Sequence, residues 1–178
     1  RRCRDRRVSP YKRQPDYQLP AAAACDIPPV VVGAGPAGLF AALVLAEAGL
    51  RPILLERGQP TEQRTLDVEA FWSGGVLDTE SNVQFGEGGA GAFSDGKLSL
   101  SEEVGGDLPT LIGADFTKQL IDYTDGIYLE FGADTHIEGL EHEDEKKEIR
   151  KNAIKAGLKL VDCPIRHLGT EKAQQIYY

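Results

Sequence analysis

Three glycines at a fixed spacing constrain this chain more than any other feature of its sequence. Gly33, Gly35 and Gly38 form a Gly-x-Gly-x-x-Gly pattern between a β-branched apolar run, residues 29–32, and an Ala/Leu-rich stretch, residues 39–48. Short β-branched runs are typical of buried strands, and alanine and leucine are strong helix formers. The pattern therefore predicts a buried strand, a tight turn and a helix in direct succession.

A second strand is expected after this helix. Gly49 is a helix stop signal, and residues 52–55 form another apolar run, which ends in Glu56. Pro36 suits the first turn of the helix, because the N–H that proline lacks would have no partner there. Two such strands joined by one helix predict a right-handed βαβ unit with a parallel strand pair.

Each part of this unit suits a dinucleotide. Gly33 permits the tight turn, Gly35 lets the backbone approach a pyrophosphate, and Gly38 lets the helix pack close to the strand. The helix N-terminus presents unpaired N–H groups to phosphates. Glu56 lies 18 residues after Gly38, where a carboxylate accepts hydrogen bonds from an adenosine ribose. The pattern does not separate FAD from NAD, and a glycine-rich turn without a ligand is the alternative.

A second glycine-rich segment spans residues 81–98. Its five clustered glycines are Gly86, Gly88, Gly89, Gly91 and Gly96. Ordering such a segment costs conformational entropy, so close approach to a large planar or anionic ligand is expected to offset that cost. The N–H groups around residues 88–91 predict an anion-binding nest, with Ser94, Asp95 and Lys97 at its rim. A flexible surface loop is the alternative.

Composition and charge argue against several classes of function. The net charge of −8 and the aromatic content of 7% argue against a nucleic-acid partner. Residues 27–46 carry no charge, but their glycine-rich centre breaks a spanning helix, so no membrane partner is expected. Cys3, Cys25 and Cys163 lie far apart and form no metal-ligand spacing, which favours a reducing, cytoplasmic compartment and predicts no metal site. A small-molecule substrate or electron acceptor is the expected partner.

The beginning of the chain differs from the rest. Residues 1–13 hold seven basic residues and one acidic residue, and the sequence contains no methionine. Residues 1–26, with three prolines, are interpreted as a tail or linker. The lopsided charge and the missing methionine lead us to expect a portion of a longer protein.

The second half predicts mainly helices. Apolar residues at spacings of three and four predict an amphipathic helix over residues 115–131. A charged helix is expected over residues 142–156, stopped by Gly157, and residues 158–161 are compatible with a strand. Thr170 is the expected N-cap of a final helix. The mixed composition of residues 59–80 predicts no element.

Four stretches resemble the bacterial family of FAD-dependent dehydrogenases, flavoproteins of the type with two dinucleotide-binding domains. These stretches are residues 30–42, 55–58, 81–98 and 164–170. The third is the most distinctive, and the similarity runs from about Tyr11 to the end of the chain. The resemblance implies an α/β fold: a Rossmann-like, three-layer FAD-binding domain around a parallel sheet. Within it, residues 27–98 would be an incomplete FAD-binding part and residues 99–178 the start of an inserted substrate domain.

The resemblance also implies FAD as the cofactor and names its contacts. The residues against the pyrophosphate would be Gly33, Gly35, Pro36, Ala37 and Gly38. Glu56 would take the adenosine ribose with Arg57 beside it, and Arg64 would lie near the phosphates. The residues approaching the pyrophosphate and the isoalloxazine side would be Gly89, Ala90, Gly91, Ser94 and Asp95.

The expected function is flavin-mediated hydride or electron transfer by an FAD-dependent oxidoreductase. An NAD-dependent dehydrogenase and a non-enzymatic FAD-binding module are the alternatives. No residues form a recognisable acid–base or nucleophile set, so none is predicted to be catalytic. His167 either faces the substrate side or is a capping or core histidine.

Overall fold

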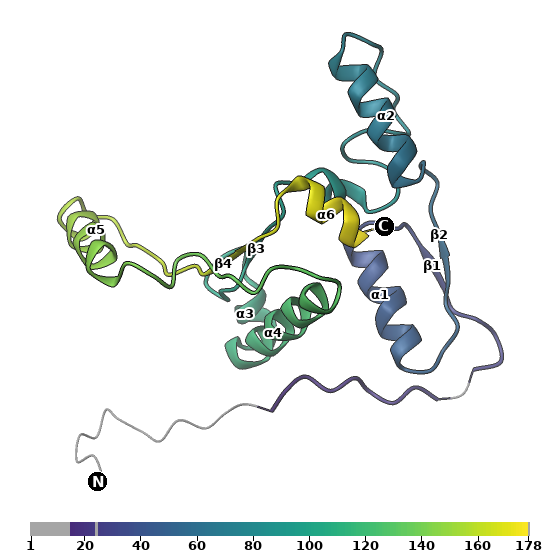
Figure 1. Cartoon of the computed structure of the whole chain (residues 1–178). Coiled ribbons are helices and arrows are strands. Elements are labelled where there is room, and N and C mark those ends of the chain that lie inside the picture. The colour runs from purple at the N-terminus through teal and green to yellow at the C-terminus, as the bar shows by residue number, and fades with distance from the viewer. Residues whose placement is uncertain (1–14, 24, 178) are drawn as a thin grey trace.

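The structure is a computed structural model that describes residues 15–23 and 25–177 of the 178-residue chain. The basic segment 1–13 lies outside the described residues. The elements are β1 (Val30–Val32), α1 (Pro36–Glu47), β2 (Ile53–Leu55), α2 (Thr61–Trp72), the 3₁₀ helix η1 (Gly89–Phe93), β3 (Lys97–Ser99), α3 (Leu108–Ile112), α4 (Ala114–Glu130), α5 (Glu143–Lys155), β4 (Ile165–His167) and α6 (Thr170–Tyr177). Figure 1 shows α2 and α5 at two separate extremities, with α6 returning to lie near the start of α1.

The predicted strand–turn–helix–strand unit is confirmed. Strands β1 and β2 are parallel, with Val30 opposite Ile53 and Val32 opposite Leu55. Helix α1 packs on both strands and begins at Pro36, as the missing N–H of proline favours. It ends just before Gly49, whose φ of +85° suits a glycine after the last helical turn.

The expectation that the first strand is buried is wrong for the described chain. Val32 is 82% exposed and Val30 56% exposed, and Leu55 of β2 is 50% exposed. The reason is that β1 pairs only with β2 among the described residues, and α1 is the element that packs on this pair. The described strands form two separate pairs, one parallel and one antiparallel, so the three-layer parallel sheet stays a prediction.

The helices predicted in the second half are confirmed, and two α-helices that were not predicted, α2 and α3, are present as well. Helix α4 covers the expected 115–131 region, and α5 ends before Gly157, whose φ is +73°. Helix α2 occupies residues 61–72, where the mixed composition predicted no element. Its first turn is capped by a side chain from the second glycine segment, so the signal for its start is not local in sequence.

Two expectations near the end of the chain are wrong. Residues 158–161 form no strand; the strand is β4, which pairs antiparallel with β3 so that Lys97 lies opposite His167. Thr170 is not the N-cap of α6 but its first residue. The carbonyl of the preceding residue, Gly169, already accepts a helical hydrogen bond from the N–H of Ala173.

A buried arginine joins β4 to α4. Arg166 is 2% exposed, and its guanidinium forms a two-point ion pair with Asp125, with an Nη2–Oδ2 distance of 2.7 Å. It also donates to the carbonyl oxygens of Asp134 and His136. The hydrogen bond to Asp125 raises the pKa of Arg166 despite burial. This ion pair fastens the segment after α4 and the β3–β4 pair to the same helix.

Helix α4 is also tied to the βαβ unit. The Tyr123 hydroxyl donates to the Glu47 carboxylate at the end of α1 over 2.7 Å, and the ring of Tyr17 packs edge-on against Tyr123. Burial and this hydrogen bond raise the pKa of Tyr123 to about 12. Both effects favour the neutral hydroxyl in the folded state.

Tyr123→Phe is expected to lower the free energy of unfolding by about 1 kcal/mol at neutral pH, the usual contribution of one hydrogen bond. A tyrosine with its folded pKa raised stabilises the fold fully below its unfolded pKa of about 10, and loses that contribution as pH rises towards the folded value. Urea unfolding from neutral pH to pH ~12 should therefore show the wild type and Tyr123→Phe converging above pH ~10. Parallel curves would contradict this assignment.

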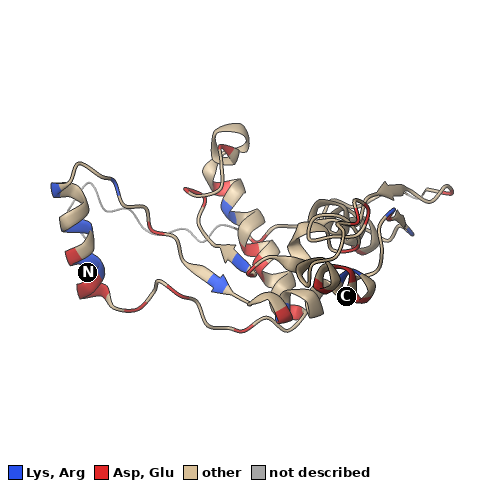
Figure 2. Ribbon diagram, turned by 90° about the horizontal axis from the view of Figure 1, so that it is seen from above, with Lys and Arg blue, Asp and Glu red and all other residues tan. Residues whose placement is uncertain are grey.

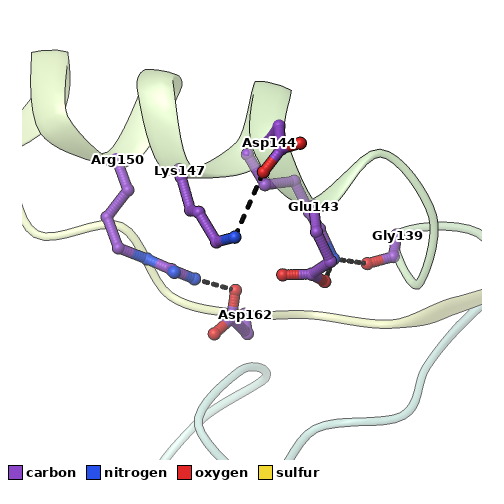
Figure 3. Close-up of polar contacts among 7 residues, drawn as sticks. Gly139, Glu143, Asp144, Lys147, Arg150 and Asp162 are labelled. Carbon is purple, nitrogen blue, oxygen red and sulfur yellow. Dashed lines mark hydrogen bonds and ion pairs between the residues drawn. The ribbon is translucent and has the colours of Figure 1, made fainter.

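Helix α5 is held mainly by exposed ion pairs. Its first turn contains Glu143 and Asp144, and Lys147 follows one turn later, an order that matches the helix dipole (Figure 2). Figure 3 shows Lys147 reaching Asp144 and Arg150 reaching Asp162 at 2.5 Å. Exposed pairs of this kind contribute little to stability, so we expect α5 to depend weakly on each of them.

Candidate dinucleotide site

The first glycine turn has the geometry that the sequence predicts. Gly33 has a φ of +99°, and its N–H donates to the carbonyl oxygen of Leu55 over 2.7 Å. A Cβ on Gly38 would lie 1.8 Å from the Gly33 carbonyl oxygen, so the start of α1 touches the turn at that point. A side chain at either position would change the turn, which is why glycine is required there.

The N-terminus of α1 is open. Gly35 is the N-cap residue and provides no side-chain cap, and Pro36 and Ala37 are exposed. The first N–H groups of a helix have no partner within it. A Cβ on Gly35 would meet only the Cα of Gly89, at 3.9 Å. These residues thus form a cradle of backbone donors that fits a pyrophosphate; contact with one stays a prediction.

Glu56 is fixed at the edge of this turn. Its carboxylate accepts the N–H of Ala34 and the N–H of Gly58, each over 2.7 Å. Burial opposes its charge, but these backbone donors hold the pKa of Glu56 below its usual range. An ionised carboxylate with two donors keeps further acceptor capacity for a ribose hydroxyl. Its neighbour Arg57 is exposed and pairs with Glu80 over 2.7 Å.

The structure brings the two glycine segments together. The N–H of Gly88 donates to the Ala34 carbonyl over 2.9 Å, and a Cβ on Gly89 would lie 2.9 Å from the Cα of Gly35. The family resemblance placed both segments near the same pyrophosphate, but it did not predict that their backbones touch. The close approach explains why the second segment requires glycine beside the first turn.

The last helix covers the other side of the second segment. A Cβ on Gly91 would lie 2.9 Å from the Tyr177 ring, and one on Gly88 would lie 3.2 Å from the Tyr177 Cβ. The Tyr177 hydroxyl forms a hydrogen bond with that of Tyr128 from α4, and burial raises the pKa of Tyr128. Tyr177 was not among the predicted site residues, since its sequence neighbourhood carries no motif.

The side chain of Arg64, from α2, lies against the backbone of the second glycine segment. It is fully buried, and it donates to the carbonyl oxygens of Asn82, Glu87 and Gly89. Its guanidinium carbon lies 4.7 Å from the centre of the Phe93 ring. Burial lowers the pKa of Arg64, but an arginine remains charged at physiological pH. The resemblance implies that Arg64 lies near the phosphates, whereas in the structure its N–H groups donate to the backbone of residues 82, 87 and 89.

The predicted flavin-side residues differ in exposure: Gly89 is buried and Gly91 half-buried, and the other three form an exposed rim. Ala90, Ser94 and Asp95 are all exposed. The Ser94 hydroxyl bonds the Gly91 carbonyl over 3.0 Å and accepts the Gly96 N–H over 3.1 Å, so it shapes the exit of the loop. The Asp95 carboxylate pairs with Lys97 over 2.7 Å.

His167 lies on the same side, opposite Lys97 in the β3–β4 pair. Its Nδ1 atom is 3.5 Å from the Glu138 carboxylate, and its side chain is exposed. The alternative of a core histidine is therefore wrong, and the alternative of a capping histidine stays a prediction. A role towards the substrate stays a prediction.

Two further observations concern metals and membranes. Within residues 15–23 and 25–177, no three His, Cys, Asp or Glu side chains are grouped so that they would hold a metal ion. In the same part of the chain, none of the helices combines the length and apolar character needed to span a bilayer.

The parallel β1–β2 pair, the glycine turn and α1 fit the Rossmann-like α/β class of dinucleotide-binding proteins. Residues 29–94, less than half of the chain, match the family model described as FAD binding domain. The predicted resemblance and the predicted cofactor, FAD, are thereby confirmed. The comparison does not favour an NAD-dependent dehydrogenase.

A relative shares the same region. An uncharacterized protein of Clostridium beijerinckii is 68% identical over 71 residues, which is 40% of this chain and 13% of that protein. The chain thus matches a small part of the relative's length.

Proposed function

We propose that the protein is an FAD-dependent oxidoreductase, in which the flavin passes a hydride or electrons between a small-molecule substrate and an acceptor. The observation that carries this proposal is the contact of two glycine segments at the open N-terminus of α1, with Gly35 facing Gly89. FAD supplies the hydride and electron chemistry when bound. The described residues supply binding, orientation and charge.

In this proposal each part of the site has one task. The backbone donors at Gly35 and Ala37 hold the pyrophosphate, and Pro36 fixes the helix start without using a donor. Glu56, held ionised by the Ala34 and Gly58 N–H groups, accepts the ribose hydroxyls. The exposed rim with Asp95 would face the flavin ring. A larger parallel sheet completing the domain belongs to the same proposal.

Gly35→Val tests the pyrophosphate position separately from folding. The Cβ at Gly35 would lie 3.9 Å from the Gly89 Cα, an ordinary contact, so its addition does not force the backbone apart. The larger valine side chain would fill the space that the phosphates need. We expect FAD binding to be lost, with affinity falling roughly 100-fold or more, while the thermal midpoint changes little. Flavin fluorescence titration and a thermal melt measure the two effects. Unchanged FAD affinity would show that the cofactor lies elsewhere.

The visible spectrum of the purified chain tests the cofactor, together with identification of what denaturation releases. Released FAD supports the proposal, whereas a chain stabilised by NAD and not by FAD contradicts it. A second measurement separates an enzyme from a binding module. The bound flavin is photoreduced, and its reoxidation by a soluble electron acceptor is compared with that of free FAD. Faster reoxidation of the bound flavin supports an oxidoreductase. Reoxidation no faster than that of free FAD indicates a non-enzymatic FAD-binding module.

The charge and the cysteines of the chain support a proposal about its partner and its cellular location. The net charge of −8 supports a small-molecule partner rather than a phosphate backbone or an anionic membrane surface. Cys25 and Cys163 are free thiols, which supports a reducing, cytoplasmic compartment. Fractionation of cells that produce the protein tests this placement.

A further inference from the structure

A buried arginine on α2 organises the backbone of the second glycine segment. The Arg64 Nη2 atom donates to Asn82 O over 2.7 Å and to Gly89 O over 2.9 Å, Nε donates to Asn82 O over 3.1 Å, and Nη1 donates to Glu87 O. The planar guanidinium carries five N–H donors in a fixed fork, which lets one side chain hold three separate carbonyls.

The segment supports α2 in return. The Glu87 carboxylate accepts both the N–H of Thr61, over 3.0 Å, and its hydroxyl, over 3.2 Å. The N–H of Glu87 donates to Gln59 O over 3.1 Å. The N-cap position of α2 is Pro60, which has no side-chain cap to offer. Glu87 therefore supplies the carboxylate that the N-terminus of α2 lacks.

Glycines provide the space for these contacts between α2 and the glycine segment. A Cβ on Gly86 would lie 2.4 Å from the Arg64 Cδ, and a Cβ on Gly58 would lie 2.4 Å from the Gly86 Cα. The arginine stem therefore occupies the space that a side chain would take at Gly86. Gly89, whose carbonyl binds Arg64, is the residue that abuts Gly35 in the first turn. The contacts thus run without a gap from α2 to the cofactor site.

We propose that Arg64 and Glu87 form a reciprocal clamp between α2 and the glycine segment, and that Arg64 positions the FAD site through the backbone without touching FAD. This inference rests on FAD binding at the two glycine segments. Arg64 has 0% of its surface exposed, so a phosphate cannot reach the guanidinium unless the loop opens. Its charge is matched instead by carbonyl oxygens and the face of Phe93. Arg64 is a positioning residue in this arrangement.

A clamp and a direct phosphate contact predict different effects of salt, and of the Arg64→Lys substitution, on the affinity for FAD. FAD affinity is measured by flavin fluorescence, at low and at high salt, for the wild type, Arg64→Lys and Arg64→Gln. The control is Arg51→Lys, a matched change at an exposed position. With a clamp, both Arg64 variants lose affinity alike, roughly tenfold or more, because a lysine ammonium cannot span three carbonyls. Their salt dependence equals that of the wild type, since no phosphate contact has been removed.

The opposite pattern would overturn the proposal. If Arg64→Lys keeps near wild-type affinity while Arg64→Gln loses it with a flatter salt dependence, Arg64 binds a phosphate directly. Reciprocity is tested by Glu87→Ala combined with Arg64→Lys. A clamp predicts a double variant that loses less affinity than the two single losses combined, whereas independent, additive losses contradict it.

A readout without FAD keeps the test valid if the chain binds no cofactor. Hydrogen exchange of the peptide covering residues 86–91 is compared in wild type, Arg64→Lys and Arg51→Lys. The clamp predicts faster exchange in that peptide for Arg64→Lys, with helix α4 unchanged and with Arg51→Lys like wild type. Unchanged exchange at 86–91 overturns the clamp, and general loss of protection, including α4, shows that Arg64 serves global folding instead. If the wild type binds no FAD, that result contradicts the proposed FAD site but not the clamp, which the hydrogen-exchange measurement still tests.

Discussion

We expect Gly38→Ala, which adds a single methyl group, to lower the stability of the protein more than any of the other proposed substitutions. The added Cβ would lie 1.8 Å from the Gly33 carbonyl oxygen and 3.0 Å from its carbon, and both atoms are backbone. The turn and the helix must move apart to relieve this overlap, which separates the two parts of the cofactor cradle. We expect the free energy of unfolding to fall by about 3 kcal/mol. We also expect FAD binding to be lost, and urea unfolding with flavin titration measures both effects.

Gly126→Ala is the matched control. Gly126 lies within α4, and a Cβ there would meet no atom within 4 Å apart from its chain neighbours and the nearby backbone of its own helix. Alanine is more favourable than glycine inside a helix by about 1 kcal/mol, so this variant should be more stable than wild type. The two alanine substitutions should therefore shift stability in opposite directions. A similar shift for both would show that α1 does not approach the turn as closely as described.

Asp125→Asn is expected to produce the second largest loss. It removes the charge that faces the buried Arg166 guanidinium, whose side chain is 3% exposed. Breaking a buried ion pair from one side leaves an uncompensated charge, and we expect a loss of about 3 kcal/mol in the free energy of unfolding. The β3–β4 pair should lose protection in hydrogen exchange together with α4, because Arg166 joins them.

The control for this variant is Asp162→Asn. Asp162 pairs with Arg150 at 2.5 Å, but both side chains are partly or largely exposed (Figure 3). An exposed pair contributes less than about 1 kcal/mol, so Asp162→Asn should be nearly neutral. If the two asparagine variants cost the same, the burial of Arg166 has no energetic consequence and the assignment is wrong.

Local sequence signals predicted the cofactor turn well. Gly33, Gly38 and Gly49 stand where the chain adopts a positive φ or touches backbone, and such demands are met by one residue type. The amphipathic spacing of α4 was equally readable, because one helical face packs against the rest of the chain. In both cases the cause lies within a few residues of the signal.

The features that sequence reasoning missed depend on distant partners. Helix α2 begins at Thr61 with a cap from Glu87, and Arg64 finds its acceptors in the same remote loop. The burial of β1 was predicted from its β-branched residues, but Val32 is 82% exposed because too few elements cover it. A β-branched residue type indicates a tendency to form a buried strand. Whether the strand is in fact buried depends on which other elements pack against it.

The order of synthesis gives the packing of Tyr177 a further meaning. The βαβ unit and both glycine segments are synthesised before α6, and folding during synthesis begins with N-terminal regions. Until translation reaches Tyr177, nothing from α6 lies against Gly88 and Gly91. The glycine segment is therefore synthesised early and gains its contact with α6 late, so it is more open in the nascent chain before α6 is made than afterwards.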